Sequence, residues 1–263
     1  MTAKSNVLRS IALTAIPVSV VAWLGTLPSP WASWMPATCM PDHCFCEALR
    51  PALVRQPTNT MTSFVFMTVA FVVFGLPGVT ERPSRKNLLS TTPVHSSLFA
   101  SALALIGLGS AFYHASLSFV GQTGDVLGMY LLGTFILLYN FARWRPLSPT
   151  RAGAAYVVGN LVLLGLLIGI PELRRYAFAA IIVGALSLEW RIRRERGVSA
   201  DARLLLAAVG TFAVGFAFWI LDLTGAVCAP ESLLQGHGLW HLTGAASAAL
   251  VYAYYRSESY AEE

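Results

Sequence analysis

Eight apolar runs divide the chain, and their length constrains the fold more than any other feature of the sequence. A transmembrane helix needs about 20 apolar residues, and most of the runs approach that length. They cover approximately residues 8–27, 61–79, 96–118, 124–142, 152–171, 176–190, 203–221 and 237–255. Only 12% of the 263 residues are charged, whereas a soluble domain carries about 25%. The composition argues against a water-soluble enzyme, a nucleic-acid-binding protein or a disordered chain, and predicts an all-α integral membrane protein.

We expect four parts along the chain. Residues 1–27 would form an N-terminal transmembrane helix, or an uncleaved signal anchor, because Lys4 and Arg9 precede the first apolar run. Residues 28–60 would form a cysteine-containing loop outside the cytoplasm. Residues 61–256 would form a seven-helix catalytic bundle, and residues 257–263 a cytoplasmic tail.

The orientation follows from the positions of Lys and Arg. With eight crossings, the two termini and the loops after residues 79, 142 and 190 share one side, which carries most of the basic residues. The opposite side has only Arg50, Arg55, Arg174 and Arg175. The positive-inside rule places the first side in the cytoplasm, which explains the net charge of +5 without a nucleic-acid partner. We expect a multi-pass protein of a bacterial inner membrane, with the lipid bilayer as its environment.

All four cysteines, Cys39, Cys44, Cys46 and Cys228, fall on the outer side in this topology. Thiols on an oxidising side of a membrane favour disulfides, and we expect one between the 28–60 segment and the loop before residue 237. The alternatives are that the cysteines are unpaired, or that Cys44 and Cys46 bind a metal with His43.

Polar residues mark the outer ends of four apolar runs, although such residues are costly inside a bilayer. Ser110 and His114 end one run, Asp125 begins the next, Asp222 ends the seventh, and the eighth begins at His237-x-x-x-His241. Alternating crossings place these residues at one depth, and residues four apart share a helix face. Three histidines with a carboxylate nearby are typical of catalytic zinc.

Simpler interpretations exist for each residue. The histidines could be hydrogen-bonded at the membrane interface, Asp125 could cap a helix N-terminus, and Ser110 could permit close helix packing. Asp222 could tether two helices or support a histidine. His95, on the cytoplasmic side, is expected to have no functional role.

The ordered residues resemble the alkaline ceramidases, within the superfamily of seven-helix membrane hydrolases that includes the adiponectin and progestin receptor-like proteins. The resemblance rests on Ser110-x-x-x-His114, Asp125, Phe218-Trp219-x-x-Asp222, His237-x-x-x-His241, Cys46-Glu47 and Asn59-Thr60. It covers roughly residues 44–256 and leaves the first apolar run as an extra helix.

The resemblance implies a zinc-dependent amidase that cleaves the N-acyl bond of a membrane lipid, ceramide, to a fatty acid and a sphingoid base. It implies zinc ligands at His114, His237 and His241, catalytic roles for Asp125 and Ser110, a Cys46–Cys228 disulfide, and supporting roles for Asp222, Glu47 and Asn59. Calcium regulation is doubtful, because Glu47 alone remains of the acidic calcium ligands and Gln56 stands where a glutamate is expected.

Two other classes of function fit the same residues. The zinc site could be structural, in a receptor-like or scaffold protein, or the enzyme could hydrolyse another acyl lipid, since the same metal chemistry serves amides and esters.

Overall fold

The computed structural model describes residues 3–40, 42, 44–76, 88–196 and 199–259. No β-strand forms in this part of the chain, where extended pairing is limited to the isolated bridges Pro28–Ala52, Pro36–Ser118 and Ser199–Ser259. The all-α prediction is therefore confirmed. His43, the basic residues Arg82, Arg85 and Lys86, and the last four residues of the expected tail lie outside the described residues.

The predicted apolar runs correspond to long helices, except that the second run contains two shorter ones. The helices are α1 (Ala3–Leu24), α2 (Pro57–Ser63), α3 (Val65–Gly75), α4 (Leu88–Thr91), α5 (Val94–Ser116), α6 (Phe119–Trp144), α7 (Pro149–Gly169), α8 (Arg174–Glu195), α9 (Ala202–Leu223) and α10 (Gly236–Ser257). The short 3₁₀ helices η1 (Trp31–Ser33) and η3 (Pro171–Leu173) lie in loops.

Some helix ends differ from the predicted runs. α2 begins at Pro57 rather than at residue 61, because proline fits the first turn of a helix. α8 extends beyond the predicted run at both ends. Its added turns carry charged residues, including the i, i+4 ion pair of Arg191 with Glu195, and a pattern based on hydropathy does not detect such turns.

Among the residues that the structure describes, six helical segments are long and apolar enough to cross a membrane, so the chain is a multi-pass membrane protein. They are α1, α2 with α3, α5, α6, α7 and α9. α8 and α10 are of similar length, but charged residues at both ends of α8 and polar residues along α10 lower their hydropathy.

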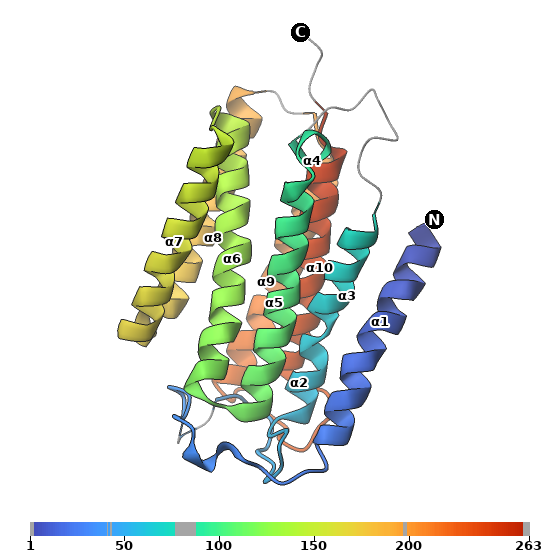
Figure 1. Ribbon diagram of the computed structural model, residues 1–263, viewed down its shortest axis with the longest axis vertical. Helices are drawn as coiled ribbons and strands as arrows, with labels where there is room; N and C mark the ends of the chain where they lie inside the picture. Colours follow the sequence, from blue (N-terminus) through green and yellow to red (C-terminus); the bar gives the residue numbers. More distant parts are fainter. Residues whose placement is uncertain (1–2, 41, 43, 77–87, 197–198, 260–263) are drawn as a thin grey trace.

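The helices form an elongated bundle (Figure 1). The described residues of segment 25–56 lie at one end, here called the loop end, and the N-terminal end of α1 and the last turn of α10 lie toward the opposite, terminal end. α5 packs between α3 and α6, α9 packs against α10, and α1 lies at the edge against α3. α5 and α9 end at the loop end, and α6 and α10 begin there.

A buried ionic network fixes the terminal end. Arg143 of α6 donates hydrogen bonds to Glu258, which follows α10, at 2.9 and 3.0 Å. The same guanidinium pairs with Glu189 of α8, and Tyr254 of α10 donates its hydroxyl proton to Glu189. Buried charges of both signs therefore join α6, α8 and α10 at the end opposite the loop.

Close backbone contact between α5 and α6 brings polar residues together at the loop end. A Cβ atom on Gly109 of α5 would lie 2.6 Å from the carbonyl oxygen of Gly124 in α6, so only glycine fits there. The next residues along the two helices are Ser110 and Asp125, and this packing places them side by side.

Candidate metal centre

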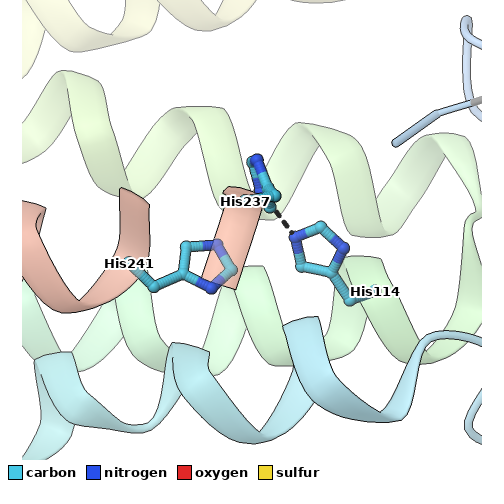
Figure 2. A group of neighbouring side chains, drawn as sticks. All are labelled: His114, His237 and His241. Carbon is cyan, nitrogen blue, oxygen red and sulfur yellow. Dashed lines mark hydrogen bonds between the residues drawn. The ribbon is translucent and has the colours of Figure 1, made fainter. Parts of the chain in front are cut away.

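Three histidine rings from two helices meet in the loop-end half of the bundle. His114 comes from α5, and His237 and His241 come from α10; all three are buried. Their potential ligand atoms all lie within 4.8 Å of one another. Figure 2 shows the rings gathered around one point, and Nε2 of His237 lies 3.1 Å from Nε2 of His114.

Gln56 determines which nitrogen of His114 carries the proton. Oε1 of Gln56 lies 2.9 Å from Nδ1 of His114, while Nε2 of Gln56 donates to the carbonyl oxygen of Glu47 at 3.2 Å. An amide oxygen can only accept, so Nδ1 of His114 is the donor. The Nε2 lone pair of His114 is then free to bind a metal.

Thr62 plays the same part for His241. Oγ1 of Thr62 lies 2.9 Å from Nδ1 of His241, and the hydroxyl donates to the carbonyl oxygen of Thr58 at 2.9 Å. A hydroxyl has one proton, so Oγ1 accepts a hydrogen bond from Nδ1. Nε2 of His241 therefore also keeps its lone pair.

These contacts fit the three histidines to a divalent metal ion. Two rings have their Nδ1 protons held by oxygen acceptors, which is how metal-binding histidines are oriented in proteins. Two facing Nε2 atoms 3.1 Å apart need a proton or a cation between them. In the part of the chain that the structure describes, this is the one group of three or more potential ligand residues close enough to hold a metal.

Ser110 lies beside the histidines, and Asp125 lies next to Ser110. Oγ of Ser110 is 3.3 Å from Nε2 of His241, and the close contact of Gly109 with Gly124 brings Asp125 of α6 next to Ser110. The interpretation of Asp125 as a helix cap is wrong, because α6 begins at Phe119 and Ser118 caps it by accepting from the Gly121 N–H. Asp125 is therefore free of a capping role.

Asp222 joins two segments near the centre. Its Oδ1 accepts from the backbone N–H of Cys46, and its Oδ2 accepts from the backbone N–H of His237, both at 3.0 Å. Gly236 permits this approach, because a Cβ atom there would lie 2.9 Å from Cβ of Asp222. The carboxylate thus holds the backbone of His237 rather than its ring.

Glu47 lies next to α2, and Asn59 lies in its first turn. Both carboxylate oxygens of Glu47 accept backbone N–H groups, from Thr58 at 2.6 Å and from Asn59 at 2.8 Å. Burial raises the pKa of the Glu47 carboxyl, and these N–H groups act in the opposite direction. Glu47 therefore caps α2. The buried side-chain amide of Asn59 has no hydrogen-bond partner among the described residues.

The four cysteines form two disulfides, Cys39–Cys44 and Cys46–Cys228. The alternative of a metal site at Cys44 and Cys46 is wrong, because both sulfur atoms are oxidised. Cys46–Cys228 joins residues 182 positions apart and ties segment 25–56 to the loop between α9 and α10.

The sequence analysis gave no role at the metal centre to three residues of this region: Phe45, Gln56 and Thr62. Phe45 stacks on His237 with ring centroids 3.7 Å apart. The available signals were slight, namely an aromatic residue between two cysteines and polar residues where an apolar run begins.

His95 lies at the other end of α5, far from the histidine group. Its Nδ1 is 3.2 Å from the carbonyl oxygen of Leu88 in α4.

Comparison with known protein families gives a match to the model described as Ceramidase over residues 45–263. The matched part contains the histidine group, Ser110, Asp125, Asp222 and both residues of the Cys46–Cys228 disulfide. It leaves out α1 and the Cys39–Cys44 disulfide. The comparison with curated proteins finds no match.

Proposed function

The chain belongs to the ceramidase family, and we propose that it is a zinc-dependent intramembrane amidase. It would hydrolyse the N-acyl bond of ceramide-type lipids to a fatty acid and a sphingoid base. Family membership supports hydrolysis of a lipid amide. The observation that carries the zinc dependence is the pair of Nδ1 hydrogen bonds from His114 to Gln56 and from His241 to Thr62, because they direct free Nε2 lone pairs to one place.

The ion would be held by Nε2 of His114 and His241 and by the ring of His237. When bound, zinc supplies a Lewis acid that lowers the pKa of water and polarises an amide carbonyl. Asp125 takes the proton from the attacking water and delivers it to the leaving nitrogen, because an amide anion is a poor leaving group. Ser110 donates a hydrogen bond to the carbonyl oxygen as negative charge develops there.

The packing of the bundle supports a lipid substrate. α9 packs against α10 and α6 packs against α8, and the contacts between these two pairs include the buried side chains that join α6, α8 and α10 at the terminal end. Large apolar side chains of α9, such as Leu206 and Val214, are exposed, as expected for a surface that faces lipid chains. We propose that the substrate enters the centre from the side, without leaving the bilayer.

The proposed location is a bacterial inner membrane, with the centre near its extracytoplasmic face and both termini in the cytoplasm. The two disulfides lie at the loop end, which suits an oxidising compartment. Segment 28–60 would then be extracytoplasmic, and α1 would stay attached as an additional transmembrane helix.

The test combines metal analysis with a substrate panel. Protein purified in detergent or nanodiscs would be analysed for bound metal, then incubated with ceramide, an N-acyl amino acid and a phospholipid. We expect one zinc ion per chain and fatty acid release from ceramide, lost with a chelator and restored by zinc. Zinc-loaded protein that releases nothing would favour a structural or receptor-like site, and release from phospholipid alone would favour another lipid hydrolase.

A further inference from the structure

The ring of His237 is held differently from the rings of the other two histidines. His114 and His241 each have an oxygen acceptor at Nδ1. Nδ1 of His237 is buried and has no hydrogen-bond partner among the described residues. Its ring is instead stacked on Phe45, with centroids 3.7 Å apart and an angle of 30° between the planes.

Phe45 itself is fixed by covalent bonds on both sides. The preceding residue, Cys44, is bonded to Cys39, and the following residue, Cys46, is bonded to Cys228. The Phe45 ring also contacts Tyr113 edge-on, with centroids 6.1 Å apart. Because the backbone of Phe45 is held by two disulfides, stacking on His237 costs little further conformational entropy. The Phe45–His237 contact is therefore largely preorganised.

Asp222 sets the relative position of the two stacked residues. One carboxylate oxygen accepts from the backbone N–H of Cys46, next to Phe45, and the other accepts from the backbone N–H of His237. The segment that carries the phenyl ring and the helix that carries the imidazole ring are thus joined through one buried carboxylate.

From these contacts we propose that Phe45 is a positioning residue for the metal centre: its ring takes the place of the missing hydrogen-bond acceptor and holds His237 in the orientation that binds the ion. The proposal rests on the proposed function only in taking the three histidines as metal ligands. Residues that orient a metal-binding histidine typically change metal affinity by about 10- to 100-fold, and we assign Phe45 an effect of that size.

The test measures zinc affinity by competition with a chromophoric chelator, using the full chain stripped of metal. We expect Phe45→Ala and Phe45→Leu to weaken zinc binding by about 10-fold or more. Phe45→Tyr and Phe45→Trp keep a flat ring and should stay close to the wild-type affinity. Trp34→Ala is the matched control, because Trp34 contacts Trp31 and Phe112.

The variants separate stacking from packing. Leucine fills part of the space of phenylalanine but offers no flat face, so Phe45→Leu with wild-type zinc affinity would overturn the proposal even if Phe45→Ala failed to fold. An equal loss of affinity in Trp34→Ala would also overturn it, by showing a general effect of the loop. Cobalt-substituted protein adds a second readout, since a misplaced His237 changes the visible absorption of the bound ion. A wild-type chain that binds no metal would instead refute the zinc site itself.

Discussion

Oε1 of Gln56 lies 2.9 Å from Nδ1 of His114, so a neutral amide holds this histidine in place. The same side chain donates to the backbone carbonyl of Glu47, whose carboxylate caps α2. Gln56 therefore links the loop before α2 to the metal centre, at the position where the resemblance to ceramidases leads one to expect a glutamate.

Replacing Gln56 by leucine should weaken zinc binding by about 10- to 100-fold, because Nδ1 of His114 loses its acceptor. Gln56→Glu keeps an oxygen at that place and should retain most of the affinity. Competition with a chromophoric chelator measures both. Gln122→Leu is the control, since Gln122 is also a buried glutamine but contacts Thr38. Equal affinity in Gln56→Leu and the wild type would show that Gln56 does not orient His114.

Asp125→Asn should abolish amide hydrolysis while the protein keeps its metal. Asparagine has nearly the same shape but cannot take a proton from water, and loss of a general base costs about 100-fold or more in rate. Fatty acid release and zinc content would be measured on the same sample. Asp201→Asn, at the start of α9 near the terminal end, should retain activity. Turnover in Asp125→Asn at the wild-type rate would exclude Asp125 as the base.

The two disulfides should differ in their contribution to stability. Loop-closure entropy assigns about 5 kcal/mol to a bond that closes a loop as long as that of Cys46–Cys228 and about 2 kcal/mol to one as short as that of Cys39–Cys44. Their sequence separations are 182 and 5 residues. Both cysteines of one disulfide would be replaced by serine in each variant. Thermal unfolding of the two variants in the same detergent would rank the contributions of the two disulfides to stability. A larger loss from the Cys39–Cys44 pair would contradict it.

Arg143→Met should destabilise the fold without changing the metal centre. The change removes the guanidinium that pairs with both Glu189 and Glu258 and leaves Arg193, 3.6 Å from Glu189, as the nearby arginine; breaking a buried ion pair costs about 3–5 kcal/mol. Thermal unfolding measures the loss, and zinc competition should give the wild-type affinity because the network lies at the terminal end. Arg145→Met, at an exposed arginine, is the control. Weaker zinc binding in Arg143→Met would reveal coupling between the two ends.

The helices and the depth of the polar residues could be predicted from the sequence because both depend on local properties. An apolar run of about 20 residues forms a spanning helix wherever it occurs in a chain. Alternating crossings then place Ser110, His114, Asp125 and His237 at one level. The spacing of His237 and His241 likewise fixes their common face.

The partners of these residues were decided only by the tertiary structure. Gln56 meets His114 across 58 residues, and Thr62 meets His241 across 179. Whether such side chains touch depends on the rotation of each helix about its axis and on the contact distance between helices, as at Gly109.

The same reason applies to the loop. The sequence predicts disulfides on the outer side, but the placement of Phe45 over His237 requires the loop to fold back against α5 and α10. The length of an apolar run and the spacing of residues along one helix depend only on residues that are neighbours in the sequence. The orientation of a metal ligand depends on side chains that packing brings together from distant parts of the chain.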